Sequence, residues 1–247
     1  MSERFELATI GEIVAGNARA AEVFEEFGID FCCGGRRSLA EACQRAAVDQ
    51  GAVVRALEGV ARPRPAQDGD DAARWPLDRL IDHIVEMHHG YVRRALPVIA
   101  RRLERLEQSH GERHRELARV VNLFRELGIE LTQHMMKEEQ VLFPYIRELV
   151  ELEQQGCEVH QSPFGTVENP IRMMEREHRE MADALRTIRE LTGGYDVPAD
   201  GCITYELSMA DLARFERDLH RHVHLENNVL FPAATALEQQ RGEAEEA

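Results

Sequence analysis

One eleven-residue pattern occurs twice in the chain and constrains its fold more than any other feature. Residues 134–144 and residues 222–232 both have the pattern His-x-x-x-Glu-x-x-Val-Leu-Phe-Pro. A further histidine precedes each copy, His89 before the first and His178 before the second, and each lies within a helical pattern. An internal repeat of this length predicts an architecture built from two related halves.

The repeat also places side chains that can bind metal. Residues i and i+4 lie on one face of a helix, so each copy presents an imidazole beside a carboxylate. Two such helices facing each other would gather His134, Glu138, His222 and Glu226 at one point. Helical bundles hold pairs of iron or manganese ions with carboxylate-rich clusters of this kind.

His89 and His178 lie on apolar stripes of the two partner helices and would complete the site. A single histidine on such a stripe is more often a core residue than a ligand. Four histidines and two glutamates at repeat-related positions favour ligation, because burying so many polar groups without compensation would be very costly. Mixed imidazole and carboxylate donors suit iron or manganese, whereas a structural zinc site would be expected to contain cysteine.

The composition favours an all-α protein without a nucleic-acid or membrane function. The 247 residues are 43% apolar, 30% charged and only 6% aromatic, and the net charge of −15 would repel phosphate backbones. No apolar run approaches the roughly 18 residues of a membrane span, and no secretory signal is recognised. Five cysteines at irregular spacings do not form a disulfide framework, so we expect a reducing cytoplasm.

Residues 1–61 are predicted to form a small helical domain. A Thr-x-x-Glu capping box at Thr9 opens a helix that Gly28 ends, and a Ser-x-x-Glu box at Ser38 caps the next helix. A third helical stretch covers about residues 53–60.

Residues 62–76, rich in proline and then acidic, are predicted to be a linker, and residues 77–240 a second domain. The second domain contains four helical patterns, at residues 77–107, 112–153, 169–192 and 203–238. Two helix pairs related by a repeat predict an up-down-up-down four-helix bundle. Pro97, Pro144 and Pro232 should kink these helices, with a helix end as the alternative at the last two.

Both repeat copies, together with the loop Asp30-Phe31-Cys32-Cys33-Gly34-Gly35, resemble the Repair of Iron Centres family. The resemblance covers nearly the whole chain. It implies a hemerythrin-like di-iron bundle preceded by a small ScdA-type domain, in which Phe31 replaces the family's usual tyrosine.

The resemblance adds His110 to the ligands, because the family has a histidine downstream of the first-helix ligand and His110 occupies that position here. The repeat counterpart of His110 falls near Ala199, which cannot ligate. Two iron ions, bridged by an oxygen and by both glutamates, would then share five histidines. If these divide three and two, one iron keeps a vacancy where nitric oxide, dioxygen or peroxide could bind.

The vicinal pair Cys32-Cys33 has two interpretations. It could be a packed turn of small side chains, or a redox or cluster-handling pair whose thiolate pKa is lowered by its position between glycines and a helix start. The family resemblance favours the second, with the linker allowing the pair to reach the iron centre.

The function implied by the resemblance is repair of iron–sulfur clusters damaged by nitric oxide or oxidants. The protein would bind or reduce nitric oxide, or supply iron, with damaged iron–sulfur proteins as partners. Two alternatives remain, a hemerythrin-like sensor or carrier of dioxygen or nitric oxide, and a nitric oxide reductase. Whether the chain is an enzyme stays open, with nitric oxide reduction at the di-iron site as the possible activity, and the chain is expected to be a monomer or a homodimer.

Overall fold

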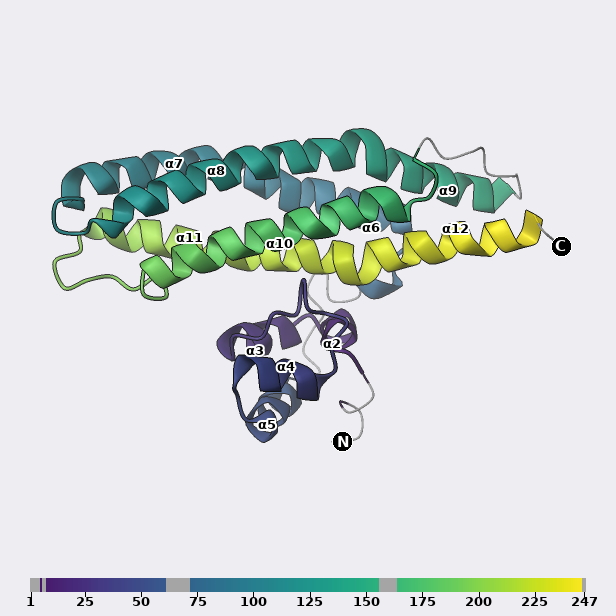
Figure 1. Ribbon diagram of the computed structural model, residues 1–247, viewed down its shortest axis with the longest axis horizontal. Helices are drawn as coiled ribbons and strands as arrows, with labels where there is room; N and C mark the ends of the chain where they lie inside the picture. Colours follow the sequence, from purple (N-terminus) through teal and green to yellow (C-terminus); the bar gives the residue numbers. More distant parts are fainter. Residues whose placement is uncertain (1–4, 6–7, 61–71, 156–163, 246–247) are drawn as a thin grey trace. The chain divides into compact units, whose positions relative to one another are not determined.

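The computed structural model describes residue 5 and residues 8–60, 72–155 and 164–245. The described residues are mainly helical and contain no β-strand, only one isolated bridge between Thr9 and Ser38 (Figure 1). The predicted all-α class is therefore confirmed. The linker predicted at 62–76 lies outside the described residues as far as residue 71, as do Cys157 and His160.

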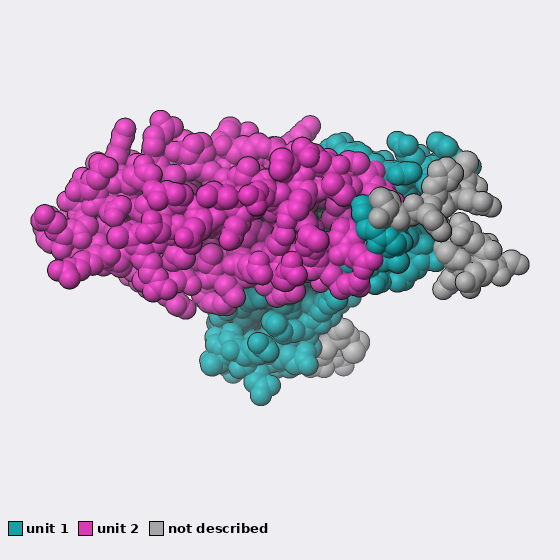
Figure 2. All heavy atoms as spheres, turned by 45° about the horizontal axis from the view of Figure 1, so that its top comes forward, with its two compact units in different colours: residues 1–82, 146–168, 220–247 teal, residues 83–145, 169–219 magenta. Residues whose placement is uncertain are grey.

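Two compact units can be distinguished (Figure 2). The first contains residues 1–82, 146–168 and 220–247, and the second contains residues 83–145 and 169–219. Among the described helices, none is both long and apolar enough to span a bilayer.

Within residues 8–60, the N-terminal part of the first unit contains the short helices α2 (Ile10–Gly16), α3 (Ala20–Glu26), α4 (Leu39–Ala46) and α5 (Gln50–Val60). Both predicted capping boxes are present. The Thr9 and Ser38 side chains each accept a hydrogen bond from the backbone N–H of the glutamate three residues later, and that glutamate's side chain accepts one from the backbone N–H of the capping residue. Gly28 ends α3 with a φ of +66°, in the left-handed conformation that favours glycine.

The single helix predicted from Thr9 to Gly28 is wrong, because α2 and α3 are separate. Asn17 has an extended backbone that ends α2. Its side-chain oxygen accepts a hydrogen bond from the Arg19 N–H at 3.2 Å, and its carbonyl accepts one from the Ala20 N–H at 2.8 Å. Local bonding by an asparagine side chain competes with continued helix, which is why the chain turns here.

The second unit consists of long helical segments that lie alongside one another in Figure 1. Its elements are η2 (Ile84–His89), α7 (Gly90–His110), α8 (Glu116–Lys137), η3 (Glu138–Leu142) and the parts of α10 (Glu168–Leu191) and α11 (Ile203–Leu225) up to residue 219. Phe124 of α8 meets Phe215 of α11 edge to face, with ring centroids 5.4 Å apart. Arg189 of α10 forms a two-pronged ion pair with the buried Glu216 of α11.

In the part of the chain that the structure describes, three π-helical turns interrupt the long helices, and each begins or ends at a predicted ligand. They are η2, η3 and η4 (Glu226–Leu230). In η3 the Phe143 N–H bonds to the carbonyl of Glu138, five residues back, and the Phe231 N–H bonds to Glu226 in the same way in η4. Such wide turns occur frequently at functional sites.

The prolines of the repeat follow directly after these wide turns. Pro144 and Pro232 are the second residues of α9 (Phe143–Gln155) and α12 (Phe231–Glu245). A proline inside a regular α-helix would clash with the carbonyl four residues earlier, and the wider turn relieves that crowding. The alternative that each proline ends its helix is wrong, because both helices continue.

Candidate metal centre

The spacing of the repeat brings each histidine beside its glutamate. His134 Nε2 lies 3.2 Å from Glu138 Oε1, and His222 Nε2 lies 3.0 Å from Glu226 Oε1. All four side chains are at most 1% exposed. The first copy runs from the end of α8 through η3 to the start of α9, and the second runs from the end of α11 through η4 to the start of α12.

The two upstream histidines are fully buried and contact the first copy. His89 Nε2 lies 3.5 Å from Glu138 Oε2. His178 Nε2 lies 2.9 Å from His134 Nε2, so two ring nitrogens face each other. The six residues predicted from the repeat are therefore all buried, and their donor atoms point inward.

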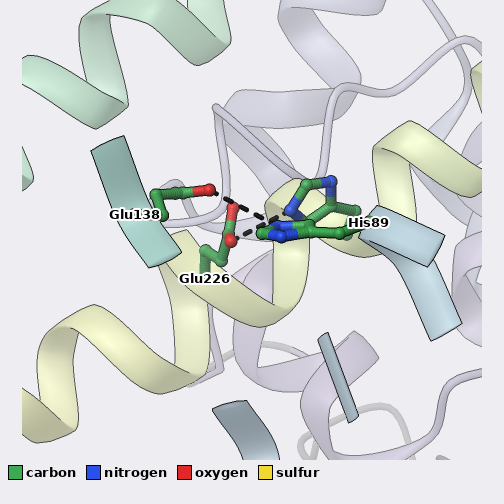
Figure 3. A group of neighbouring side chains, drawn as sticks. His89, Glu138 and Glu226 are labelled. Carbon is green, nitrogen blue, oxygen red and sulfur yellow. Dashed lines mark hydrogen bonds and ion pairs between the residues drawn. The ribbon is translucent and has the colours of Figure 1, made fainter. Parts of the chain in front are cut away.

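Two groups of these donors could each hold a metal ion, because within each group the ligand atoms all lie within 4.8 Å of one another. The first group is His89, Glu138, His222 and Glu226, and the second is His134, Glu138, His178 and Glu226. Figure 3 shows His89, Glu138 and Glu226 of the first group with their polar ends directed toward one another. Both groups share the same two carboxylates.

This donor set fits a bound cation. Two carboxylates with no solvent exposure carry a large desolvation cost unless positive charge compensates them. Imidazole nitrogens and carboxylate oxygens are borderline and hard donors, which suits iron, manganese or zinc. The facing nitrogens of His134 and His178 would both be satisfied by one cation.

An outer carboxylate orients His89. Glu139 Oε1 lies 2.6 Å from His89 Nδ1, and Arg93 contacts the same oxygen at 2.5 Å. Burial raises the pKa of Glu139, but the hydrogen bonds from His89 and Arg93 outweigh it and lower the pKa. A carboxylate on Nδ1 fixes the ring and leaves Nε2 for a metal.

Glu177 orients His134 in the same way. Its Oε2 lies 2.9 Å from His134 Nδ1, and Lys137 contacts its other oxygen. The hydrogen bond to His134 is the main reason that the pKa of Glu177 is lowered to about 2. Glu177 was missed from the sequence, where its position next to His178 was the only signal.

The structure does not bring His110 to either group. His110 is the last residue of α7, so it lies about 30 Å along the helix from His89 at 1.5 Å per residue. It is grouped instead with His114 and Asp200. The assignment of His110 as a ligand of the same centre is therefore corrected, because no side chain covers that distance.

Cys202 lies beside His110, with its Sγ 3.2 Å from the histidine Nε2. The backbone N–H of Tyr205 and the ring of His110 lower the pKa of Cys202 to about 7. A cysteine near a helix start is the kind of position where the thiolate is favoured. Nothing in the sequence pattern had indicated a role for this residue.

Cys32 and Cys33 are both free thiols, with their Sγ atoms 4.0 Å apart. Asp30 accepts a hydrogen bond from the Cys33 N–H at 2.9 Å, and its carboxylate lies 3.3 Å from Cys32 Sγ. The contact with Cys33, burial and the charge of Asp30 all raise the pKa of Cys32. The expectation of a lowered thiolate pKa is wrong for Cys32, because its surroundings disfavour negative charge.

The loop that carries the cysteines is held by η4 within the first unit. The Asn228 side-chain amide donates to the carbonyl of Cys32 at 3.0 Å, and Asn227 donates to the same carbonyl at 3.3 Å. A Cβ on Gly35 would overlap the Asn228 amide, so this close approach requires glycine. The residues next to Glu226 therefore anchor the cysteine loop.

Comparison with known proteins places the donor groups in a cation-binding domain. The family described as "Hemerythrin HHE cation binding domain" matches residues 80–234, and ScdA_N, described as a domain of unknown function, matches residues 6–61. The chain is similar to the iron-sulfur cluster repair protein YtfE of Musicola paradisiaca, with 34% identity over 239 residues, 96% of this chain and 97% of that protein. It is 32% identical to YtfE of Escherichia coli O1:K1 over 227 residues (92% and 96% of the two chains). It is also 31% identical to a probable iron-sulfur cluster repair protein of Haemophilus influenzae over 223 residues (90% and 94%).

Proposed function

Because the chain belongs to the hemerythrin HHE cation-binding family and, over nearly its whole length, to the family of iron–sulfur cluster repair proteins, we propose that it repairs iron–sulfur clusters through a bound pair of iron ions. The damage would come from nitric oxide or oxidants, and the clients would be the damaged iron–sulfur proteins. The family membership confirms the resemblance drawn from the repeat and the cysteine loop.

The sharing of Glu138 and Glu226 by both donor groups is the observation that carries the di-iron proposal. Each group has two histidines of its own, and both have the same two carboxylates. Glu138 and Glu226 would therefore be available to both ions, a use of carboxylates from facing helices that is known in helical bundles that bind pairs of iron ions. His110 is left out of this ligand set.

The chain's own residues would prepare the site for metal. Glu139 and Glu177 hold the Nδ1 protons of His89 and His134, so that each Nε2 is available as a neutral donor. Burial of the carboxylates excludes water and makes their negative charge available to a cation. Iron, when bound, would supply a redox-active centre for nitric oxide or dioxygen.

The cysteine pair would assist the transfer of iron or electrons to the client. Both thiols are free, which suits a reducing cytoplasm. Cys32→Ser and Cys33→Ser should leave the two irons of the buried centre in place but impair repair, because neither residue belongs to the two His/Glu groups.

Metal analysis of anaerobically purified protein tests the centre. We expect about two irons per chain in the wild type and loss of both in Glu226→Ala, because the carboxylate belongs to both groups. Glu206→Ala is the control, since Glu206 is an exposed glutamate of α11, the helix that leads into η4 and Glu226. Full iron retention in Glu226→Ala would refute the proposal that both ions share the Glu226 carboxylate.

Reactivation of an iron–sulfur enzyme damaged by nitric oxide tests the repair role. Iron-loaded protein should restore client activity, and the metal-free protein should not. A reversible nitric oxide or dioxygen adduct without reactivation would favour the sensor or carrier. Catalytic release of nitrous oxide without reactivation would favour the reductase.

A further inference from the structure

A separate group of metal donors lies where two inter-helix connections meet in the second unit. His110 ends α7, His114 lies in the turn before α8, and Asp200 lies in the loop before α11. The ligand atoms of these three residues all lie within 4.8 Å of one another. Cys202, two residues after Asp200, contacts the group through its Sγ, 3.2 Å from His110 Nε2.

His114 has the same pair of contacts as two of the four histidines of the buried centre. Its Nδ1 lies 3.1 Å from Glu116 Oε1, and its Nε2 lies 3.0 Å from Asp200 Oδ1. His89 and His134 likewise have an outer carboxylate on Nδ1 and an inner carboxylate on Nε2. An outer carboxylate that fixes the ring is a general feature of metal-binding histidines.

His110 adds a buried donor to this group. Its side chain is 7% exposed, and its Nδ1 has no hydrogen-bond partner among the described residues. The rings of Tyr205 and His114 flank it, with centroids 5.6 and 6.2 Å away. A buried ring nitrogen without a hydrogen-bond partner carries a desolvation cost, and His110 Nδ1 is therefore available as a donor.

We propose that His110, His114, Asp200 and Cys202 form a separate site for one divalent transition-metal ion. Two imidazoles, one carboxylate and one thiolate are donor types that zinc accepts, with Cys202 joining the three grouped residues through its contact with His110. The site is open to solvent, because Cys202 is exposed and the Asp200 side chain is 37% exposed. The ion would tie the connection between α7 and α8 to the start of α11.

An ion-pair cluster without metal is the competing interpretation. Arg113 Nη1 lies 3.0 Å from Asp200 Oδ2, so Asp200 already has one cationic partner. That contact uses Oδ2 and leaves Oδ1 directed at His114. A salt-bridge cluster needs neither the contact of Cys202 with His110 nor the burial of His110.

Cobalt(II) titration of the full-length, iron-loaded protein separates the two interpretations. A thiolate bound to cobalt(II) gives an intense near-ultraviolet charge-transfer band, and the buried His/Glu groups contain no thiol. We expect one further equivalent of cobalt(II), with a band that is lost in Cys202→Ser and retained in Cys33→Ser. Zinc added first should prevent the band.

The neighbouring carboxylate provides a graded test. Glu116→Ala should weaken zinc binding about 10–100-fold by freeing the His114 ring, whereas the exposed Glu112→Ala should not change it. Absence of a further cobalt(II) equivalent, or a bound equivalent without a thiolate band, would overturn the proposal. A band that survives Cys202→Ser and disappears in Cys33→Ser would assign the metal to the other cysteine loop and also overturn it.

Discussion

Removal of the Glu177 carboxylate tests whether outer hydrogen bonds organise the iron ligands. Glu177 accepts a hydrogen bond from His134 Nδ1 at 2.9 Å and contacts Lys137 with its other oxygen. Without it the His134 ring can rotate and can lose the tautomer that presents Nε2 to the metal. Glu177 itself is not a member of either donor group, so the substitution removes no ligand.

The Glu177–His134 hydrogen bond allows the loss of metal affinity to be estimated. A hydrogen bond to a charged group contributes about 1.5–3 kcal/mol, and loss of an outer carboxylate generally costs about 10–100-fold in metal affinity. Both ranges agree, since tenfold corresponds to about 1.4 kcal/mol. We therefore expect Glu177→Ala to weaken iron binding about 10–100-fold. Glu177→Gln should weaken it less, because its amide oxygen can still accept from Nδ1.

Competition for iron with a chelator of known affinity measures this change. Glu180→Ala is the matched control, because Glu180 lies on the same helix and its side chain is 64% exposed. Thermal unfolding of the metal-free variants measures separately how much stability Glu177→Ala loses with the His134 contact, so that this loss is not mistaken for a loss of metal affinity. Equal iron affinity in Glu177→Ala and Glu180→Ala would refute the orienting role, as would an equal loss in Glu177→Gln and Glu177→Ala.

Three further predictions concern stability and reactivity. Gly35→Ala should destabilise the protein by about 1–3 kcal/mol, because the added Cβ overlaps Asn228. Gly59→Ala has open space around it and should stabilise α5 by about 0.5–1 kcal/mol. Chemical denaturation measures both changes in the free energy of unfolding. Alkylation of metal-free protein should modify Cys202 with a rate that rises through pH 7, because its thiolate fraction rises above a pKa of about 7, while buried Cys32 with its raised pKa stays unmodified; mass spectrometry across pH values checks both. Chelation of bound iron should lower the melting temperature and reloading should restore it, because a ligand of the folded state stabilises it, and a melting temperature unaffected by iron would contradict the burial argument.

The fold and the buried donors could be predicted because they depend on local periodicity. The four-residue spacing from His134 to Glu138 fixes their common face whatever the rest of the chain does. The capping boxes at Thr9 and Ser38 are equally local. In contrast, the break at Asn17 depends on a balance between a side-chain hydrogen bond and continued helix, which periodicity does not reveal.

Contacts between distant residues could not be read from the sequence. Glu177 and His134 are neighbours only because α10 packs beside α8. His110 was assigned from a family position, and only the length of α7 shows that it lies far from His89. Its partners His114 and Asp200 come from two different connections, whose meeting depends on how the four helices end.

The two repeat copies form similar π-helical turns, η3 and η4, but the residues that follow the ligand glutamate differ and have different roles. Both copies direct a glutamate, Glu138 or Glu226, into the donor groups. The next residue in the first copy is Glu139, which orients a ligand histidine. The next two in the second copy are Asn227 and Asn228, whose amides hold the carbonyl of Cys32 instead.

The capacity to accept or to donate a hydrogen bond accounts for this difference in roles. A carboxylate at residue 139 can hold the Nδ1 proton of His89, but an acceptor at residue 228 could not donate to a backbone carbonyl. Asn228→Asp should therefore release the cysteine loop, while Asn228→Gln, which keeps the donor, should retain part of the contact. Hydrogen exchange of the loop amides, at equal iron content, measures this. Unchanged protection in Asn228→Asp would mean that the amide contacts do not hold the loop.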